Sequence, residues 1–192
     1  MEKLTGIKKV KTAVFISGAG SNLQNLLKFS KTKKSPISID LIISNTRKAK
    51  GLKYADQFNV KKRIFNFKNI KIDEKNILIL VKKEKIKFIC LAGFMKILSK
   101  NFIKTFNGKI INIHPSLLPK YKGLHTHDRA IKNKDKFAGC TIHYVSKKLD
   151  SGKIIMQKKI KINFKDNANS LAIKVLKLEH KLYPAAIIKI LS

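Results

Sequence analysis

Short apolar runs rich in β-branched residues alternate with helix-like segments along most of this 192-residue chain. Several of the runs, such as KTAVFISG, are apolar almost throughout, which is typical of strands buried on both faces of a parallel sheet. We expect strands at residues 11–18, 37–45, 61–67, 86–93 and 108–115, with helices at 21–30, 48–59 and 73–85. This alternation predicts an α/β protein with an open, mainly parallel, twisted sheet and helices on both faces.

The last third of the chain follows a different pattern. Residues 139–146 and 152–162 are expected to pair as strands around the turn KKLDSG, and residues 170–191 to form a closing helix. No internal repeat, long linker or Pro/Gly-rich boundary divides the sequence, so we expect one domain over residues 1–192. Open α/β sheets bind ligands beyond the carboxyl ends of their strands, where this chain has the loops SGAGSN, AGFMKIL and NIHPSLLPKYKGLHTH.

The formal net charge of +32 suggests a nucleic-acid-binding module as one class of function. Nearly all of the positive charge is lysine, however, spread along the whole chain, with arginine only at positions 47, 63 and 129. Nucleic-acid readers typically show clustered arginine or basic patches interleaved with aromatic residues, and neither is evident. Joint enrichment in Lys, Ile, Asn and Phe is typical of an AT-rich coding sequence, so we interpret the lysines as a solvated surface that attracts anionic substrates only generally.

The sequence favours a cytoplasmic protein with no membrane partner. The longest apolar runs, such as ICLAGFM, are far too short to span a bilayer. The basic N-terminal residues and the apolar run behind them resemble a signal peptide, but the run is short and lacks a small-x-small cleavage site, so we expect a buried strand. Cys90 and Cys140 lie in apolar segments without metal-ligand spacing and are expected to be buried, reduced thiols.

The loop SGAGSN has the chemistry of an anion site. Its small residues allow a close turn, and Ser21 and Asn22 can cap the following helix while the free N–H groups of that helix point outward, as a phosphate site requires. The loop lacks the third glycine of the dinucleotide fingerprint and the lysine of a P-loop. A plain strand-to-helix turn explains the same residues.

Two further stretches carry groups for acid–base chemistry. Asn112 and His114 lie two residues apart in an extended segment, so they project to the same side and could polarise a carbonyl and carry a proton. Asp150 could orient an imidazole and raise its pKa. Asn-x-His also suits structural hydrogen bonding, and Asp before Ser-Gly is ordinary turn chemistry.

The other histidines of this region are assigned no chemistry. His125 and His127 are spaced like a metal-binding pair, but no third ligand has suitable spacing, so no metal is expected. His143, flanked by Ile and Tyr, is interpreted as a structural residue.

The sequence resembles the phosphoribosylglycinamide formyltransferase family, the folate-dependent enzymes of purine biosynthesis. Five stretches carry the resemblance in family order, over about residues 12 to 185: FISGAGSNLQNLL, LAGFMKILS, NIHPSLLPKYKGLHTH, GCTIHYVSKKLDSGKIIMQ and LEHKLYP. The resemblance implies a Rossmann-like formyltransferase fold. It also implies transfer of a formyl group from 10-formyltetrahydrofolate to the amine of 5-phosphoribosylglycinamide (glycinamide ribonucleotide) in de novo purine biosynthesis.

The resemblance implies a catalytic trio. Asn112 would donate a hydrogen bond to the formyl oxygen as it becomes an oxyanion. His114 would transfer protons and help to stabilise that oxyanion. Asp150 would position His114 or a bridging water and raise the imidazole pKa. No metal or covalent nucleophile is needed for this chemistry.

The same motifs imply the binding residues. Glu179 would contact the glycinamide or ribose side of the nucleotide. The nucleotide phosphate would be held by Gly20, Ser21 and Asn22, and the folate pocket would be lined by Met95, Lys96, Ile97, Leu98, Ser146, Lys147, Lys148 and Leu149. The domain would then consist of a nucleotide-phosphate half at about residues 1–100 and a folate/catalytic half at about 101–192. We expect small-molecule substrates, no specific nucleic acid, and a monomer or homodimer.

Three positions depart from the family pattern. Ala19 stands where a larger or polar residue is common, and Lys122 stands where proline is common, which would loosen its loop. The family's arginine upstream of the folate loop has no clear match, although Lys71 lies nearby. After the closing helix we expect none of the C-terminal strands that some relatives carry. No departure removes a member of the implied trio.

Two related enzymes are alternatives: methionyl-tRNA formyltransferase and a formyl-hydrolysing folate enzyme. The first would give the positive charge a purpose, but GLHTH differs from the pattern that follows HPSLLP in that family. We expect neither a tRNA-binding domain nor an N-terminal regulatory domain in this chain. The alternative from a different class is the basic nucleic-acid-binding module, which a steep salt dependence with retention at physiological salt would favour.

Overall fold

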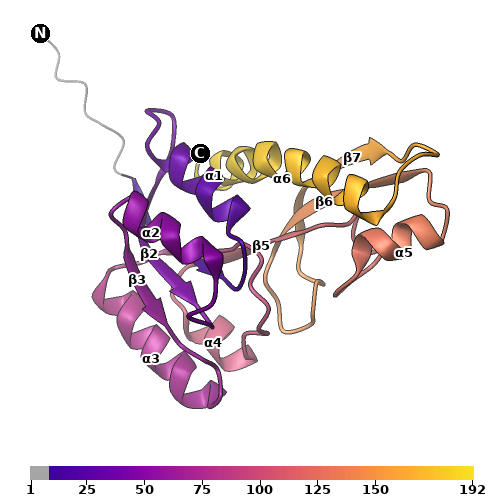
Figure 1. Ribbon diagram of the computed structural model, residues 1–192. Coiled ribbons are helices and arrows are strands. Elements are labelled where there is room, and N and C mark those ends of the chain that lie inside the picture. Colours follow the sequence, from indigo (N-terminus) through magenta and orange to yellow (C-terminus); the bar gives the residue numbers. More distant parts are fainter. Residues whose placement is uncertain (1–8) are drawn as a thin grey trace, which may run out of the picture.

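The computed structural model describes residues 9–192, which are built around one seven-stranded sheet. Its strands are β1 (Val10–Ile16), β2 (Ile37–Ser44), β3 (Lys61–Ile64), β4 (Phe88–Leu91), β5 (Lys109–His114), β6 (Phe137–Tyr144) and β7 (Ile154–Lys161). They lie in the order β3-β2-β1-β4-β5-β6-β7 (Figure 1), with β1 to β5 parallel and β6 and β7 antiparallel. The expected mainly parallel sheet and its terminal strand pair are confirmed.

Helices cover both faces of the sheet, as predicted. They are α1 (Ser21–Ser30), the 3-10 turn η1 (Lys50–Leu52), α2 (Lys53–Gln57), α3 (Ile70–Lys83), α4 (Lys100–Thr105), α5 (Thr126–Lys132) and α6 (Ala168–Leu191). One apolar core joins the sheet to α1, α2, α5 and α6, and a second joins it to α3 and α4. Figure 1 shows α1 and α6 on one side of the strands and α3 and α4 on the other.

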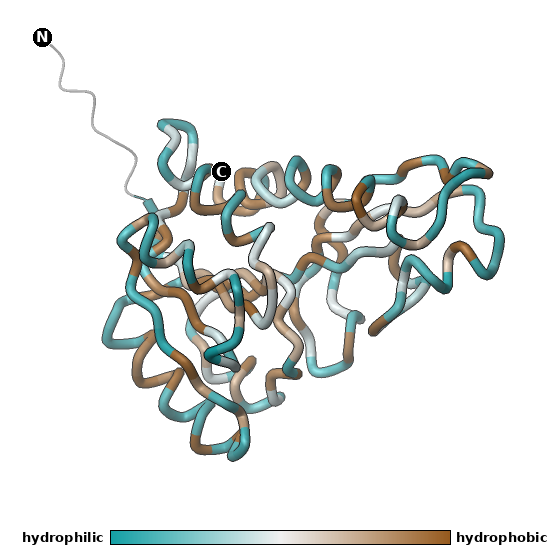
Figure 2. Tube along the Cα trace, viewed as in Figure 1, coloured by the Kyte–Doolittle hydropathy of each residue, from teal (hydrophilic) through white to brown (hydrophobic). Residues whose placement is uncertain are grey.

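The central strand β1 explains why the apolar pattern produces this architecture. Successive side chains of a strand point to opposite faces, so a strand covered on both faces needs apolar residues at every position. Val14 and Ile16 enter the first core and Ala13 and Phe15 the second, and all four are fully buried. Figure 2 shows the same arrangement, with hydrophobic strands inside and hydrophilic loops and helix surfaces outside.

The segment expected as one helix over residues 48–59 is instead the short pair η1 and α2. Gly51 packs directly against the turn after β1, because a Cβ on Gly51 would lie 2.8 Å from the Cα of Gly20. The backbone N–H of Gly51 also donates to the carbonyl of Gly18 at 3.0 Å. This tertiary contact sets where the helix can begin, and Asn59, with a φ of 52°, lies just beyond its end.

Helix α4 was not predicted, and α3 begins three residues before the expected start. The side chain of Ser99 caps α4 by accepting from the N–H of Phe102, and Asn69 caps α3 by accepting from that of Ile72. Helix α6 starts with a capping box between Asn167 and Ser170. These polar caps satisfy first-turn N–H groups and fix helix starts that apolar periodicity cannot locate.

The topology brings three loops to one edge of the sheet. The chain runs outward from β1 to β3 and then returns to the other side of β1 as β4, so the strand order reverses at β1 and β4. Crevices at such a reversal are the usual ligand sites of open α/β sheets. The backbone N–H of Ser17, after β1, donates to the carbonyl of Gly93, after β4, at 3.1 Å. The predicted ligand loops therefore meet.

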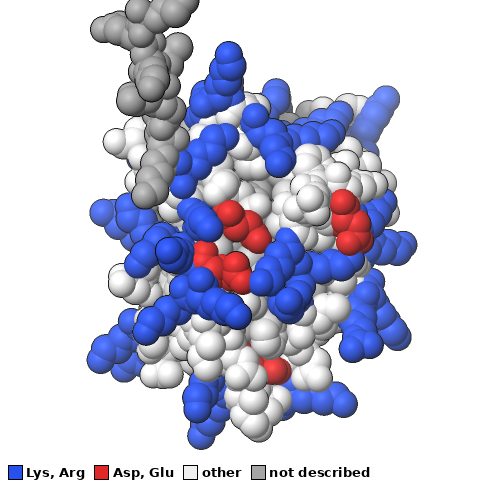
Figure 3. Space-filling model, turned by 90° about the vertical axis from the view of Figure 1, so that its left-hand side faces the viewer, with Lys and Arg blue, Asp and Glu red and all other residues white. Residues whose placement is uncertain are grey.

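The surface carries lysine over wide areas. Figure 3 shows lysine and arginine side chains scattered across one face among uncharged residues, with few acidic side chains between them. Cys90 and Cys140 are buried and free, as expected. Within residues 9–192, no helix combines the length and apolar character needed to cross a bilayer.

Candidate active site

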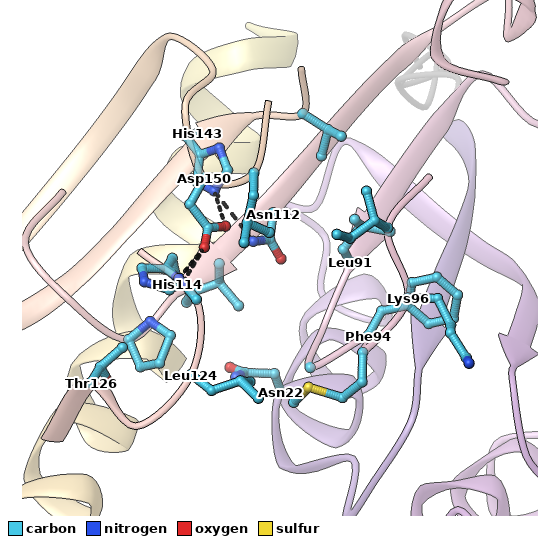
Figure 4. A pocket seen from close by; sticks show the side chains of 18 of the residues that line it. Asn22, Leu91, Phe94, Lys96, Asn112, His114, Leu124, Thr126, His143 and Asp150 are labelled. Atoms are coloured by element: carbon cyan, nitrogen blue, oxygen red, sulfur yellow. Dashed lines mark hydrogen bonds and ion pairs between the residues drawn. The ribbon is translucent and has the colours of Figure 1, made fainter. Parts of the chain in front are cut away.

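A cavity of about 610 Å³ opens where these loops meet (Figure 4). The cavity is within the size range of small-molecule sites. Twelve predicted site residues line it: Asn22, Met95, Lys96, Ile97, Leu98, Asn112, His114, Ser146, Lys148, Leu149, Asp150 and Glu179. Gly20, Ser21 and Lys147 do not line it. One wall comes from the segment after β4, another from the loop after β5, and a third from the turn between β6 and β7.

Asp150 stands at the centre of a buried polar cluster. Its Oδ2 lies 3.3 Å from Nδ1 of His114 and its Oδ1 lies 3.6 Å from Nε2 of His143. The backbone N–H of Gly123 donates to Oδ2 at 2.9 Å. Burial by itself raises the pKa of the Asp150 carboxyl, but the contact with His143 and the hydrogen bond from Gly123 outweigh it and the pKa is lowered. A carboxylate shared by two imidazoles is therefore the stable form near neutral pH.

His114 is held by acceptors at both ring nitrogens. Nε2 lies 2.8 Å from the carbonyl oxygen of Tyr121, which can only accept, so Nε2 carries a proton. Burial lowers the pKa of His114, although the Tyr121 carbonyl and the charge of Asp150 both act to raise it. The expected effect of Asp150, which is to raise the His114 pKa, is present, but desolvation of the ring outweighs it and the net shift is downward.

His143, interpreted from the sequence as a structural residue, belongs to the cavity wall. The register of β5 and β6 sets Asn112 directly opposite His143. Nδ1 of His143 donates to the carbonyl of Tyr144 at 2.9 Å, so in the neutral ring Nε2 is an acceptor. That nitrogen lies 3.2 Å from Nδ2 of Asn112 and thereby fixes which way the amide faces. The alternation of side chains along GCTIHYVS could have revealed that His143 shares a face with the site.

The turn after β1 is built differently from the expectation. Ser21 and Asn22 were expected to cap α1, but both lie inside the helix, and the N-cap is Gly20 with a φ of 77° and no side-chain cap. A Cβ at Gly20 would lie 2.6 Å from the Cα of Gly51, so glycine is required by both the backbone conformation and the close packing. The first turn of α1 keeps its N–H groups free of side-chain caps, which suits an anion.

Asn22 instead bonds across the cavity floor. Its Nδ2 donates to Oε2 of Glu179 on α6 at 2.6 Å. Glu179 is buried, which raises the pKa of its carboxyl. Within the described part of the chain, Oδ1 of Asn22 is buried and accepts no hydrogen bond. Asn22 and Glu179 thus form a buried polar pair in the cavity lining.

Apolar side chains form another part of the cavity lining. Met95, Ile97, Leu124 and Leu149 are all exposed, by 49% or more, while they line the cavity. Exposed apolar groups gathered around a cavity are typical of a site for an apolar or aromatic ligand. Lys96 and Lys148 stand among these residues and supply positive charge.

The histidine pair after this loop is split between two environments. Both line the cavity, but His125 is exposed and has a φ of 56° at the start of α5. His127 is more buried: burial lowers its pKa, and its Nδ1 makes no hydrogen bond within residues 9–192. No group of three or more His, Cys, Asp or Glu in that range is arranged to hold a metal ion.

Comparison with known proteins assigns a family to this fold and cavity. Residues 10–187 match the model of the formyl transferase family. The chain is 40% identical over 183 residues to the trifunctional purine biosynthetic protein adenosine-3 of Homo sapiens, covering 94% of this chain and 18% of that protein. It is 39% identical over 180 residues to the phosphoribosylglycinamide formyltransferase of Haemophilus influenzae, covering 92% of this chain and 85% of that protein.

Solved structures agree with the sequence relatives. The phosphoribosylglycinamide formyltransferase from Brucella melitensis superposes with a TM-score of 0.91 at 39% identity, covering 96% of this chain and 97% of that chain. The enzyme of the same name from Anaplasma phagocytophilum gives a TM-score of 0.89 at 40% identity, with 96% and 87% covered. The Rossmann-like α/β fold expected from the sequence is thus confirmed, and the chain belongs to the formyl transferase family.

Proposed function

We propose that this chain transfers the formyl group of 10-formyltetrahydrofolate to the amine of 5-phosphoribosylglycinamide, a step of de novo purine biosynthesis. The observation that carries the proposal is the convergence of Asn112, His114 and Asp150 in one cavity (Figure 4). Relatives named phosphoribosylglycinamide formyltransferase match nearly the whole chain and support the choice of substrates. The chain spans only 18% of the trifunctional relatives, whose other activities are not proposed for it.

Asn112 is suited to stabilise the oxyanion. Attack of a neutral amine on a formamide creates a tetrahedral species with a negative oxygen and a positive nitrogen. One hydrogen of the Asn112 amide is directed to Nε2 of His143, which leaves the second hydrogen for the formyl oxygen. A donor that is oriented before the reaction strengthens its interaction as charge develops on the oxygen, and this difference between ground and transition states lowers the barrier.

His114 is suited to carry the proton between the two amines. Because burial lowers its pKa, the ring is neutral near pH 7 and can accept the proton of the attacking nitrogen. Protonation of Nδ1 creates a donor that faces Oδ2 of Asp150 at 3.3 Å, so the carboxylate stabilises the charged ring. The imidazolium can then protonate the departing nitrogen of the folate. Asp150 acts through His114 in this scheme.

Different groups of residues would bind the two substrates. The uncapped start of α1 at Gly20, Ser21 and Asn22, of which Asn22 lines the cavity, suits the phosphate, and Glu179 suits the glycinamide or ribose side. The apolar wall suits the ring system of the folate, and its positive charges suit the folate carboxylates. This wall comprises Met95, Lys96, Ile97, Leu98, Ser146, Lys148 and Leu149, with Lys147 adjacent.

The test is a formyl-transfer assay with purified protein. Product is expected from 5-phosphoribosylglycinamide and the formyl folate, followed by folate absorbance, with none from methionyl-tRNA. His114→Ala and Asp150→Asn should lose activity while circular dichroism shows an intact fold. Ser38→Ala is a matched control, because within residues 9–192 its hydroxyl bonds only to Asp40, and Ser38 lies on β2 outside the cavity lining. Formyl folate consumption without an acceptor would instead identify a hydrolase.

Several expectations stay predictions. These are a single domain divided at about residue 100, a cytoplasmic location, a monomer or homodimer, and the lack of a specific nucleic-acid or membrane partner. Residues 1–8 of the proposed domain lie outside the described part of the chain. Size-exclusion chromatography with light scattering measures the oligomeric state. A salt titration of RNA binding measures whether the protein keeps affinity for nucleic acid at physiological salt.

A further inference from the structure

The segment between Phe94 and Leu98 displays its side chains in a fixed pattern. Phe94 packs edge-on against Phe15 and Phe67, with ring centroids 5.4 and 5.5 Å apart, and Leu98 is buried. Between these two anchors, the side chains of Met95 and Ile97 are 64% and 63% exposed and line the cavity. The segment lacks the hydrogen bonds of a helix or strand, so other contacts must hold its backbone.

Glu74 holds the far end of the segment. It lies on α3, is buried, and accepts hydrogen bonds from both the backbone N–H and the hydroxyl of Ser99. Among residues 9–192, no lysine, arginine or histidine forms an ion pair with it. Burial of a carboxylate without a cation costs free energy, which the hydrogen bonds that it accepts must offset. Its contribution here is to fix Ser99, where the segment meets α4.

Ser17 holds the near end. Its hydroxyl accepts from the backbone N–H of Met95 at 2.8 Å, and its own N–H donates to the carbonyl of Gly93 at 3.1 Å. Ser17 is also the first residue after β1, directly before the turn that contains Gly18 and Gly20. Ser17 therefore belongs to the turn between β1 and α1 (residues 17–20, the phosphate turn) and also fixes the backbone of Met95.

We propose that Ser17 is a positioning residue that couples the phosphate turn to the folate segment (residues 94–98). Ligand binding at one site then increases the affinity of the other site for its ligand. The inference rests on the proposed function for the identity of the two ligands. Strands β1 and β4 are paired in register, with Phe15 opposite Leu91, so the strands themselves have little freedom to shift. The loops beyond their ends are joined through Ser17, and the side-chain link between them is its hydroxyl.

The coupling is reciprocal by thermodynamic necessity. A nucleotide phosphate that orders the turn also orders Ser17, and hence the N–H of Met95 and the apolar platform of Met95 and Ile97. The folate then binds to a segment that has already lost its conformational entropy, so its own binding costs less. A neutral hydrogen bond typically changes an equilibrium by about five-fold, so a coupling factor of about five is expected.

The experiment measures the affinity of a folate analogue that carries no transferable formyl group, with and without saturating 5-phosphoribosylglycinamide. In the wild-type protein the nucleotide should tighten the analogue about five-fold. In Ser17→Ala the ratio should fall to about one, and the analogue should bind weakly even without nucleotide. Ser17→Thr keeps the hydroxyl and should restore the ratio. Ser38→Ala should behave as the wild-type protein.

Two results would overturn the proposal: a ratio of one in the wild-type protein, or an unchanged ratio in Ser17→Ala. Ser17→Cys, whose thiol is a weaker acceptor, should lie between serine and alanine and replaces the alanine variant if that protein does not fold. Failure of the proposed function is distinguished by the product assay on the wild-type protein. There, absence of formylated nucleotide rejects the substrates, whereas an active wild-type enzyme with an unaltered Ser17→Ala ratio rejects only the coupling.

Discussion

Replacing His143 by asparagine separates the hydrogen bond that orients Asn112 from the rest of the site. The asparagine amide can reach the position of Nδ1 and keep the hydrogen bond to the Tyr144 carbonyl, which is 2.9 Å long in the wild-type structure. It has no atom at the position of Nε2. The 3.2 Å contact to Nδ2 of Asn112 is lost. The Asn112 amide is then free to turn its oxygen towards the formyl oxygen, where it would repel the developing charge.

The size of the effect follows from the bonds involved. A neutral hydrogen bond contributes about 1 kcal/mol, so kcat of His143→Asn should fall by about five-fold with little change in either KM. Removing the donor itself in Asn112→Ala should cost about 10²–10³ in rate. In the Asn112→Ala background there is no amide to orient, so the coupling energy of the double-mutant cycle should be about 1 kcal/mol. Any remaining effect reports the contact of His143 with Asp150, at 3.6 Å.

The assay is steady-state formyl transfer by the four proteins of the cycle, with kcat and both KM values measured. His143→Gln is the matched control, because its amide can reach the Nε2 position and supply an acceptor to Asn112. It should recover much of the lost rate. The reasoning is refuted if the two single substitutions are additive, or if His143→Gln is as slow as His143→Asn.

Three further predictions concern other parts of the structure. The charge of Asp150 raises the pKa of His114 against the larger effect of burial, so an NMR titration of the His114 ring should give a pKa below 6.5 in the wild-type protein and a still lower pKa in the inactive Asp150→Asn variant; a higher pKa in that variant would contradict this. Burial raises the pKa of Glu179, so ionisation of its carboxyl lowers the stability of the folded protein above that pKa. Glu179→Gln should therefore raise Tm at pH 7, and this gain should vanish in acid. The KM for the nucleotide should rise in the same variant. Gly139→Ala would place a Cβ 2.1 Å from the carbonyl oxygen of Lys158, so urea denaturation should show a loss of about 1–3 kcal/mol or more, whereas Gly18→Ala, with nothing within 4 Å, should be nearly neutral.

Apolar patterning was sufficient for the sheet but not for the short helices. The residues of β1 are apolar on both faces, which specifies a covered central strand before any contact is known. Helix α4 has only six residues, too few to show helical periodicity, and depends on its Ser99 cap. The start of α1 depends on Gly51, some thirty residues further along the chain. Its close approach requires glycine at position 20, and Gly20 is the N-cap in place of Ser21.

The site shows the same division between local and tertiary information. Asn112, His114 and Asp150 could be selected from their motifs, and the fold brings all three to one cavity. The part played by His143 depends on the register between β5 and β6, which the sequence does not specify by itself. Asp150 raises the His114 pKa as predicted, but the net shift is downward because it depends on burial by the surrounding loops, which the motifs do not specify.

The most direct test of the central claim is a competition between formyl acceptors at physiological salt. Purified protein, 10-formyltetrahydrofolate, 5-phosphoribosylglycinamide and methionyl-tRNA are combined, and both formylated products are measured. The account predicts formylated ribonucleotide alone, with the product lost in His114→Ala. Formylated methionyl-tRNA with no formylated ribonucleotide, or full activity in His114→Ala, would contradict it.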